Sequence, residues 1–219
     1  MNSTTKTALV LGSSRGVGKA IAEELRKTGF DAPTISSKDI DTADQTAVLA
    51  FAEQHPSTDI LVFNTGGPPK KEFFDITNED WRKYHQQLFL SFVTLLQNIE
   101  VRDGGYIFLI SSHLIKEPTE NMTLSAAYRL ASWSVLKALS KRFAARQVSC
   151  INLALGPVLT DRLRDLTKDL VALEQKLPMK RTGKPEEVGK FVRSIVENDI
   201  KYLTGVSIPF DGGMSNSIV

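Results

Sequence analysis

Short apolar runs alternate with amphipathic segments of helical period along the whole chain. The apolar runs predict buried strands at residues 7–11, 32–36, 59–63, 106–110, 148–155 and 206–208. The segments between them predict helices at 17–29, 42–52, 78–98, 124–145, 160–177 and 185–198. Strands that alternate with helices form right-handed βαβ crossovers. The pattern therefore predicts an α/β fold, a doubly wound parallel sheet with helices on both faces.

The segment after the second predicted strand is too short for the usual edge strand. Only residues 37–40 separate this strand from the next helix, for which Asp41 or Thr42 is the expected N-cap. A parallel crossover needs about a dozen residues or more. We therefore expect six main strands, with the third strand of the doubly wound order missing or vestigial. Because no linker or internal repeat interrupts the chain, residues 1–219 are expected to form one domain.

Composition and charge exclude several classes of protein. With 42% apolar residues, the chain of 219 residues can bury a substantial core, which excludes global disorder. The net charge of +2 comes from scattered basic residues, so we expect no nucleic-acid partner. No apolar stretch approaches the ~20 residues of a membrane span, and no signal-peptide core precedes the first strand. The lone Cys150 and three isolated histidines favour a cytoplasmic protein without disulfide or metal.

The sequence from Gly12 to Gly18 reads Gly-Ser-Ser-Arg-Gly-Val-Gly and lies between a predicted strand and a predicted helix. Glycine is required where a turn needs positive φ and where the backbone must approach a pyrophosphate closely. The N-terminus of the following helix presents free N–H groups to phosphate oxygens. A tight turn without a ligand is the alternative, but this context favours a dinucleotide site.

The spacing of the glycines at 12, 16 and 18 resembles the fingerprint of the short-chain dehydrogenase/reductase family. Four further segments resemble the same family in the same order, namely 64–69 (Asn-Thr-Gly-Gly-Pro-Pro), 155–160, 178–188 and 203–213. In the family the second of these segments reads Pro-Gly, whereas here Gly156 precedes Pro157. The Asn-Thr-Gly-Gly-Pro-Pro variant resembles a divergent subgroup labelled as 3-oxoacyl reductases. The resemblance implies a Rossmann-type fold over the whole chain and a dinucleotide cofactor.

The end of the second predicted strand bears on the choice of cofactor. NAD enzymes present Asp or Glu there to the ribose 2′-OH. Here the sequence reads Ser-Ser-Lys, and an arginine lies in the glycine turn. Hydroxyl and cationic groups suit a 2′-phosphate, so we expect NADP(H), although Asp39 follows closely. The expected cofactor-binding residues are Gly12, Ser14, Arg15, Gly16, Val17, Gly18, Ser36, Ser37, Lys38, Asp41, Asn64, Gly66, Arg129, Gly156, Pro157 and Thr160.

The resemblance fails at the catalytic positions. In the family, a serine precedes the catalytic tyrosine by thirteen residues, and a lysine follows the tyrosine by four. Ser112 fits the serine, but the tyrosine position holds Ser125 and the lysine position holds Arg129. The family's asparagine, seven residues after the position of Trp81, falls on Leu88. The phenol of tuned pKa that acts as general acid or base in the family is therefore replaced.

Nearby side chains are candidates to take over these roles. Arg129 can hold ribose hydroxyls, but a guanidinium is no proton donor. His113 can relay a proton, as histidine side chains commonly do in proteins, unless it points away from the site at the end of its strand. Tyr128 lies about 60° round the helix from Ser125, and burial against the sheet or a partner helix is its alternative role. The candidate catalytic residues are Ser112, His113, Ser125, Tyr128 and Arg129.

Two hypotheses of function follow from this pattern. The first is an NADP(H)-dependent oxidoreductase with an atypical catalytic site, whose substrate is a small carbonyl compound or a conjugated enone. The second is a catalytically impaired dinucleotide-binding protein that acts as a sensor or assembly subunit. An open pocket beside Ser112 favours the enzyme, whereas a pocket filled by Leu88 or Trp133 favours the sensor. The apolar residues of helices 79–98 and 124–145 predict packing in a homodimer or homotetramer.

Overall fold

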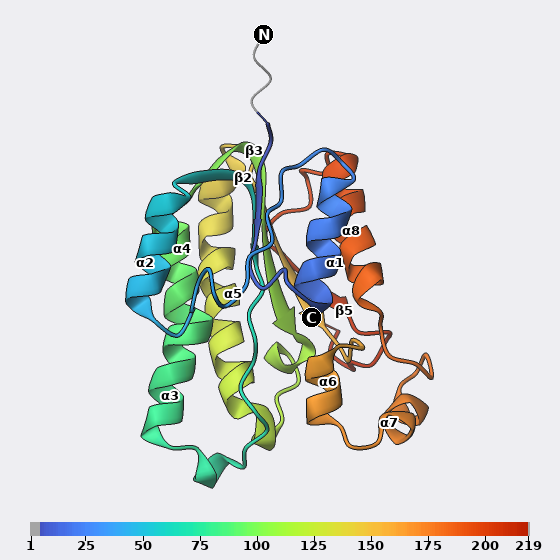
Figure 1. Ribbon diagram of the computed structural model, residues 1–219. Helices are drawn as coiled ribbons and strands as arrows, with labels where there is room; N and C mark the ends of the chain where they lie inside the picture. The colour runs from blue at the N-terminus through green and yellow to red at the C-terminus, as the bar shows by residue number, and fades with distance from the viewer. Residues whose placement is uncertain (1–4, 219) are drawn as a thin grey trace.

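A computed structural model describes residues 5–218 as a parallel sheet between two layers of helices (Figure 1). Its five strands lie side by side in the order β1-β2-β3-β4-β5. Their bounds are β1 Ala8–Val10, β2 Ser57–Phe63, β3 Glu100–Ser112, β4 Ser149–Leu155 and β5 Val206–Phe210. All neighbouring strands pair in parallel. The chain thus has the α/β doubly wound architecture that the alternating pattern predicted.

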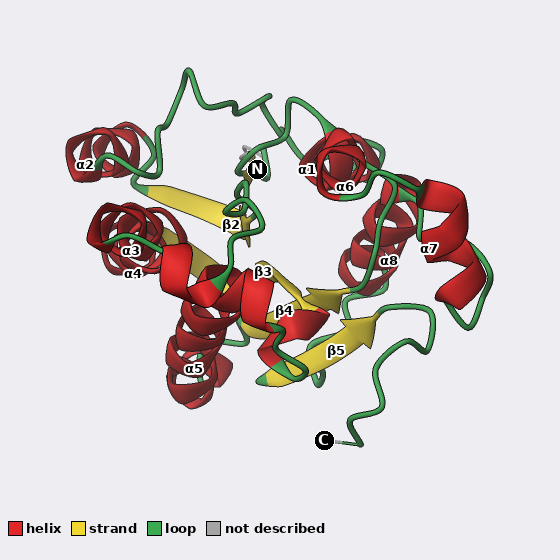
Figure 2. Ribbon diagram, turned by 90° about the horizontal axis from the view of Figure 1, so that it is seen from below, coloured by secondary structure: helices red, strands yellow, loops and turns green. Residues whose placement is uncertain are grey.

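Helices cover both faces of this sheet (Figures 1 and 2). One face carries α1 Gly16–Arg26 and α8 Pro185–Glu197, and the other carries α2 Gln45–Gln54, α4 Ser91–Asn98 and α5 Thr123–Ala144. Helix α3, Asn78–His85, continues through the π-helical turn Gln86–Leu90 into α4. The remaining elements are α6 Asp161–Leu166, α7 Leu170–Lys176 and the 3-10 turns Phe73–Asp75, His113–Ile115 and Glu120–Met122. Within the described part of the chain, no helix combines the length and apolar character needed to cross a membrane.

Alternate side chains of each strand enter two different cores. In β2, Ile60 and Val62 join the cluster beneath α1 and α8, whereas Leu61 and Phe63 join the cluster beneath α2, α4 and α5. Successive side chains of a strand point to opposite faces of the sheet. A strand that is covered on both faces must therefore be apolar throughout, which explains the unbroken apolar runs in the sequence.

The prediction of six strands was wrong, because the described residues 32–36 form no strand. The residue before this segment, Asp31, forms an isolated bridge with Thr7. Pro33 has no N–H to donate to a neighbouring strand. The Ile35 N–H donates instead to the hydroxyl of Ser13, at 2.8 Å. The described residues 37–44 are turns and irregular structure, so the third strand is missing from this part of the chain, as expected.

Two predicted helix boundaries also differ from the structure. Helix α2 has Asp44 as its N-cap, rather than Asp41 or Thr42, and this carboxylate accepts a hydrogen bond from the Thr46 N–H at 2.8 Å. The single helix expected at 160–177 is divided into α6 and α7. The division follows from Asp169, which caps α7 by accepting from the Ala172 N–H at 2.9 Å.

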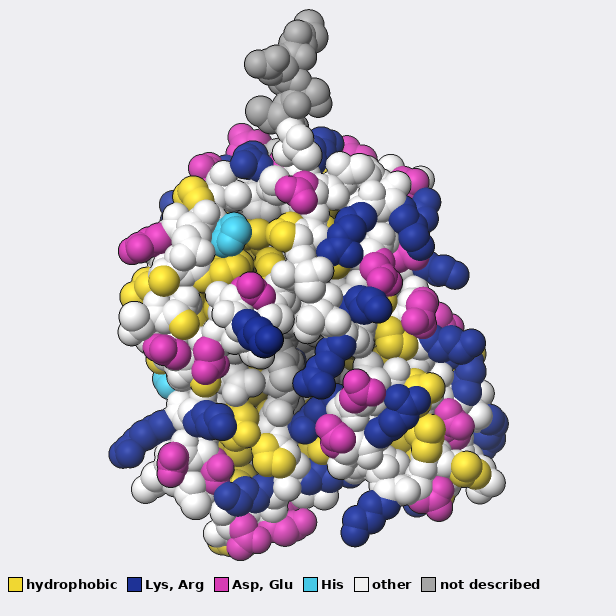
Figure 3. Space-filling model, in the orientation of Figure 1, with side chains coloured by type: hydrophobic (Ala, Val, Ile, Leu, Met, Phe, Trp, Pro, Cys, Tyr) yellow, Lys and Arg dark blue, Asp and Glu magenta, His cyan; other side chains and the backbone are white. Residues whose placement is uncertain are grey.

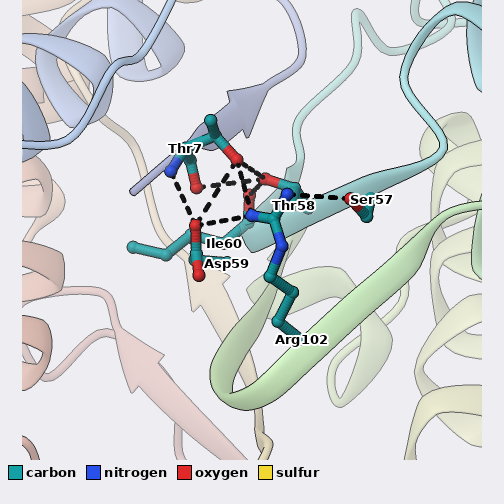
Figure 4. A network of polar contacts seen from close by, with 6 residues as sticks. All are labelled: Thr7, Ser57, Thr58, Asp59, Ile60 and Arg102. Carbon is teal, nitrogen blue, oxygen red and sulfur yellow. Dashed lines mark hydrogen bonds and ion pairs between the residues drawn. The ribbon is translucent and has the colours of Figure 1, made fainter. Parts of the chain in front are cut away.

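Polar contacts join the amino ends of the first three strands (Figure 4). Asp59 in β2 accepts hydrogen bonds from the Thr7 N–H at 2.7 Å and from Arg102 Nη1 at 2.8 Å. Arg102 in β3 also donates to the Ser57 hydroxyl at 2.8 Å. The carboxyl ends of the strands lie at the opposite edge of the sheet, which Figure 2 shows from below. In an open doubly wound sheet, ligands bind at that edge.

Candidate functional site

The turn after β1 is packed closely around glycine. Gly12 and Gly16 have left-handed backbone conformations, with φ of +63° and +56°. A Cβ at Gly18 would lie 2.4 Å from the Gly12 carbonyl oxygen and 2.7 Å from Asn64 Nδ2. Asn64, which follows β2, donates to the Leu11 carbonyl at 3.1 Å. The backbone of the turn therefore meets the loop after β2 at a distance that only glycine permits.

The amino end of α1 faces the same space. Its N-cap is Arg15, which has an extended backbone. The first N–H groups of a helix have no partner within the helix, and they attract anions. The methyl group of Thr160 lies 3.3 Å from the position that a Cβ of Gly16 would take. The end of α1 thus opens onto a narrow space bordered by the glycine turn and the start of α6.

The loop after residues 32–36 holds the groups expected at a 2′-phosphate. Ser36 and Ser37 face the cleft that the glycine turn borders, and Arg15 faces it as well. Asp39 accepts hydrogen bonds from the hydroxyl of Ser36 at 2.7 Å and from its N–H at 2.8 Å. These two bonds lower the pKa of Asp39 below its ordinary value, and the bond from the Ser36 hydroxyl has the larger effect. This carboxylate is therefore engaged within its own turn.

These elements enclose a cleft of about 700 Å³ at the carboxyl edge of the sheet. Figure 3 shows the molecule hollowed between its two layers of helices, with Lys and Arg side chains beside the hollow. The expected site residues that line the cleft are Gly12, Ser14, Arg15, Gly16, Val17, Ser36, Ser37, Asp41, Asn64, Gly66, Ser112, Ser125, Arg129, Gly156 and Thr160. Five expected residues, all within the described chain, lie outside this lining, namely Gly18, Lys38, His113, Tyr128 and Pro157.

Arg129 is anchored inside the cleft by three hydrogen bonds. Its Nε donates to the Ser125 hydroxyl at 3.3 Å, its Nη1 to the Ile110 carbonyl at 2.8 Å and its Nη2 to the Thr65 carbonyl at 3.2 Å. Burial, and secondly the charge of Arg162, lowers the pKa of Arg129 to about 10. The guanidinium therefore keeps its charge at neutral pH, and it links β3 to the loop after β2.

Ser112 and His113 form a short chain of contacts at the end of β3. The Ser112 hydroxyl lines the cleft and accepts a hydrogen bond from the Leu114 N–H at 3.3 Å. His113 Nδ1 lies 3.4 Å from this hydroxyl and 3.2 Å from the Leu155 carbonyl oxygen. A carbonyl oxygen only accepts, so the bond to Leu155 requires a proton on Nδ1. The contact of His113 with the cleft thus runs through the hydroxyl of Ser112.

Tyr128 packs into an apolar cluster beside the cleft. Its hydroxyl donates to the Trp81 carbonyl at 3.0 Å, and the two rings meet edge to face with their centroids 5.7 Å apart. Tyr84, Leu88 and Leu124 form the buried part of this cluster. Burial raises the pKa of the Tyr128 phenol. The structure thus gives this side chain the packing arrangement that was the alternative to a catalytic one.

Gln87 lines the cleft, although the sequence directed attention to its neighbour Leu88. Its Nε2 donates to the Gly66 carbonyl at 2.9 Å, whereas the Leu88 side chain is buried. The count of seven residues from Trp81 follows the family's spacing, and it ends inside the π-helical turn Gln86–Leu90. Such turns often occur at functional sites, and they change which residue faces a given side. The sequence carried no signal for this change.

Two basic residues of the cleft lining, Lys83 and Arg162, were also missed. Arg162 in α6 donates to the Pro68 carbonyl, and the Lys83 ammonium lies 5.7 Å from the centre of the Tyr84 ring. Arg162 lies in the predicted helix 160–177, where no motif marked it as a site residue. In the described part of the chain, no cluster of His, Cys, Asp and Glu could hold a metal ion.

Similarity to known proteins extends over nearly the whole chain. The profile of a family described as Enoyl-(Acyl carrier protein) reductase matches residues 31–215. The oxidoreductase YvaG of Bacillus subtilis, itself described as uncharacterized, is 26% identical over 263 aligned positions, which cover 100% of this chain and 99% of that protein.

Two solved structures resemble the chain over nearly its whole length. A blue fluorescent protein from a metagenomic library, in complex with NADPH, has a TM-score of 0.87 and 26% identity, and the match covers 98% of this chain and 100% of that one. A short-chain dehydrogenase/reductase from Serratia marcescens has a TM-score of 0.84 and 25% identity, and the match covers 96% and 98%. With its glycine turn, its sheet and a family match over most of its residues, this chain belongs to the short-chain dehydrogenase/reductase family of oxidoreductases.

Proposed function

We propose that this chain is an NADP(H)-dependent oxidoreductase with an atypical catalytic site, which reduces a small carbonyl compound or a conjugated enone. The observation that carries the proposal is the open cleft, which runs from the glycine turn to Ser112 and Ser125. The two side chains that would have closed such a pocket pack elsewhere. Leu88 is buried beside Tyr84, and Trp133 packs against the core beneath α2, α4 and α5.

The residues of the cleft fit a dinucleotide. A Cβ at Gly12 would lie 2.9 Å from the Asn64 carbonyl oxygen, so the glycine turn has no room for a side chain at this position. A pyrophosphate can therefore approach the backbone of the turn directly. The first turn of α1 offers N–H donors, and Arg15 with Ser37 offers a cation and a hydroxyl for a 2′-phosphate. The metagenomic relative was solved with NADPH, which supports the same choice here. When bound, the reduced nicotinamide supplies a hydride.

The chain's own residues at the other end of the cleft hold the substrate oxygen. Ser112 and Ser125 are hydroxyl donors, and the Arg129 guanidinium places a fixed positive charge beside them. These groups stabilise negative charge as it develops on a carbonyl oxygen. None of the three is a general acid of near-neutral pKa, so the proton comes from water or through Ser112 from His113. An enone suits this site because hydride addition converts it to an enolate, in which conjugation spreads the negative charge.

Residues 1–219 act, in this proposal, as one NADP(H)-binding domain in the cytoplasm, without nucleic-acid or membrane partners. We also propose a homodimer or homotetramer that forms through α4 and α5. Leu130 on α5 is 47% exposed, and Phe89, beside α4, is partly buried in the chain alone. Light scattering tests the assembly. If the protein is a monomer, or if Leu130→Lys leaves the oligomer unchanged, the proposed interface is wrong.

The anchoring of Arg129 favours a second candidate, the catalytically impaired cofactor-binding protein. Its guanidinium is held by two backbone carbonyls, where the family has a lysine that tunes a tyrosine. One experiment separates the two candidates. NADPH affinity is measured by calorimetry, and NADPH consumption is followed with a panel of enones and isolated ketones. Turnover of any enone supports the oxidoreductase, and tight binding without turnover over the whole panel supports the impaired protein.

A further inference from the structure

Two arginines from opposite layers of the molecule converge on one point of the cleft. Arg129 projects from α5 and Arg162 from α6, which lie on different sides of the sheet (Figure 2). The Nη2 atoms of Arg129 and Arg162 lie 3.6 Å and 3.7 Å from the position that a Cβ of Gly67 would take. Both side chains line the cleft beside Ser112 and Ser125. Two guanidinium groups thus share one small region next to the proposed reaction centre.

Neither guanidinium forms an ion pair with a carboxylate in residues 5–218, although Asp161 and Asp165 line the same cleft. All the hydrogen bonds that Arg129 donates end on uncharged oxygens, those of Ser125, Ile110 and Thr65. Arg162 donates to the Pro68 carbonyl. Asp161, the carboxylate at the start of α6, pairs with Arg164 at 3.4 Å instead.

Each arginine has five N–H donors. The described residues accept three from Arg129 and one from Arg162. The remaining donors are available to a ligand in the cleft.

The positive charges of the two arginines are not neutralised by an ion pair within the described residues. Burial lowers the pKa of both arginines, and the charge of Arg162 lowers that of Arg129 further. Asp165 lies near enough to raise the pKa of Arg162 without forming an ion pair within the described chain. Two adjacent, partly buried cations of the same sign repel each other, and an anion between them offsets the cost. The planar fork of a guanidinium matches a carboxylate in two parallel hydrogen bonds.

We propose that Arg129 and Arg162 bind a carboxylate group of the substrate, so that the natural substrate is an acidic small carbonyl compound or enone. This inference rests on the proposed function for the reaction, but the anion site itself is defined by the two arginines. A phosphate of the cofactor is the other source of negative charge in the cleft. The glycine turn and the first turn of α1 already provide for the pyrophosphate, and Gly67 lies in a different loop. The substrate is therefore the source to which we assign this site.

The test uses a binding measurement that needs no turnover. Benzoate and its neutral isostere benzamide are titrated by calorimetry into the protein, with and without saturating NADP⁺. We expect benzoate to bind at least about tenfold more tightly than benzamide, and added salt to weaken it. Arg162→Gln should lower benzoate affinity by about 10- to 100-fold and leave the affinity for NADP⁺ unchanged. Arg164→Gln, on the same helix but paired with Asp161, should change neither affinity.

Three results would overturn the assignment. Benzoate that binds no better than benzamide, or as well to Arg162→Gln, excludes a carboxylate site at this pair. Competition between benzoate and NADP⁺, with both affinities lowered by Arg162→Gln, assigns the pair to the cofactor. Failure to bind NADP⁺ at all refutes the proposed function, while the titration without cofactor still tests the anion site. Should Arg162→Gln fail to fold, Arg162→Lys keeps the charge and is expected to lose the bidentate part of the affinity.

A turnover measurement adds a second readout. Benzylideneacetone and its para-carboxy derivative differ only by the charged group. We expect the acid to have the lower KM with the unmodified protein, and Arg162→Gln to raise KM for the acid by a larger factor than KM for the neutral enone. An equal change for both substrates would assign Arg162 a structural role instead.

Discussion

The Ser125 hydroxyl accepts a hydrogen bond from Arg129 Nε at 3.3 Å, one helical turn further along α5. On the spacing in the sequence, we assign these two residues to the positions where the family has its catalytic tyrosine and lysine. A lysine beside a phenol lowers the pKa of the phenol, whereas a guanidinium beside an aliphatic hydroxyl produces no acid that titrates near neutrality. The pair can therefore hold and polarise a substrate oxygen, but it cannot exchange a proton with it at neutral pH. We therefore predict slow reduction of isolated ketones.

Restoring the family's pair should restore ketone reduction. The double variant Ser125→Tyr with Arg129→Lys provides a phenol and a lysine at the cleft wall. General-acid catalysis is typically worth about 10²–10⁴-fold, so we expect kcat for a simple ketone to rise by a factor in this range. The measurement is NADPH consumption at saturating cofactor, with NADPH affinity determined in parallel to show that the cofactor site is intact.

Tyr128→Phe is the matched control for that experiment. It removes a phenol whose hydroxyl is already bonded to the Trp81 carbonyl, so ketone turnover should stay unchanged. Rapid reduction of an ordinary ketone by the unmodified protein would contradict the impaired site. If Tyr128→Phe then abolished that activity, Tyr128 would be the acid, and its packed position in the structure would have to open.

Arg15→Ala should weaken NADPH binding selectively. The loss of one charge-assisted hydrogen bond to a 2′-phosphate corresponds to about 1–3 kcal/mol, or roughly 5- to 150-fold in Kd. NADH, which lacks this phosphate, should lose little affinity. Lys19→Ala is the control, because the exposed Lys19 in α1 pairs with Glu23. This variant should change the affinity for neither cofactor. An equal loss for NADH and NADPH would assign Arg15 to the pyrophosphate.

Gly18→Ala should abolish cofactor binding, because its Cβ would lie 2.4 Å from the Gly12 carbonyl and displace the glycine turn. Gly189→Ala in α8 is the control, since its Cβ would meet the Ala20 carbonyl at 2.6 Å, away from the turn. Both variants should lower the melting temperature. Calorimetry should show loss of NADPH affinity for Gly18→Ala alone. Unchanged NADPH affinity in Gly18→Ala would show that the turn does not approach the cofactor.

An ion pair at the start of α8 should make the free energy of unfolding depend on pH. Arg181 binds Glu187 through two hydrogen bonds of 2.7 and 2.8 Å, and this pair, followed by the Lys184 N–H, lowers the pKa of Glu187 to about 2. A carboxylate whose pKa is lower in the folded chain stabilises it above the unfolded value of 4.5, and the contribution disappears as pH falls toward about 2. Because the pair is largely exposed to solvent, which screens its charges, we expect its contribution to stability at neutral pH to be small.

Urea unfolding over this acidic range measures the contribution. Glu187→Gln should be less stable than the unmodified protein at neutral pH, and the difference should shrink as pH falls below 4.5. Glu186→Gln removes the same charge from the same helical turn and serves as the control. A difference for Glu187→Gln that does not change with pH would show that packing, rather than the ion pair, is lost.

Most of the fold could be predicted from the sequence, because its signals are local. An unbroken apolar strand such as β2 is required wherever both faces of a sheet are covered, and this requirement is visible in the order of residues alone. The missing third strand followed from the length of residues 37–40. The error at 32–36 arose because a strand depends on its neighbour as well as on its own composition. Pro33 and the bond from Ile35 to Ser13 left the described residues 32–36 without strand pairing, next to the isolated bridge of Asp31.

The sequence by itself singled out residues that line the cleft: glycines of the turn, Ser112, and the pair Ser125 and Arg129, which it predicts in place of tyrosine and lysine. These are properties of position along a strand or a helix, which periodicity reveals. Only the tertiary structure decided that Gln87 faces the cleft, because a π-helical turn shifts the helix register. Only it brought Arg129 and Arg162 together, since they come from helices on different sides of the sheet and meet at its carboxyl edge. Contacts between segments far apart in the chain depend on how the whole sheet closes, and no local pattern encodes them.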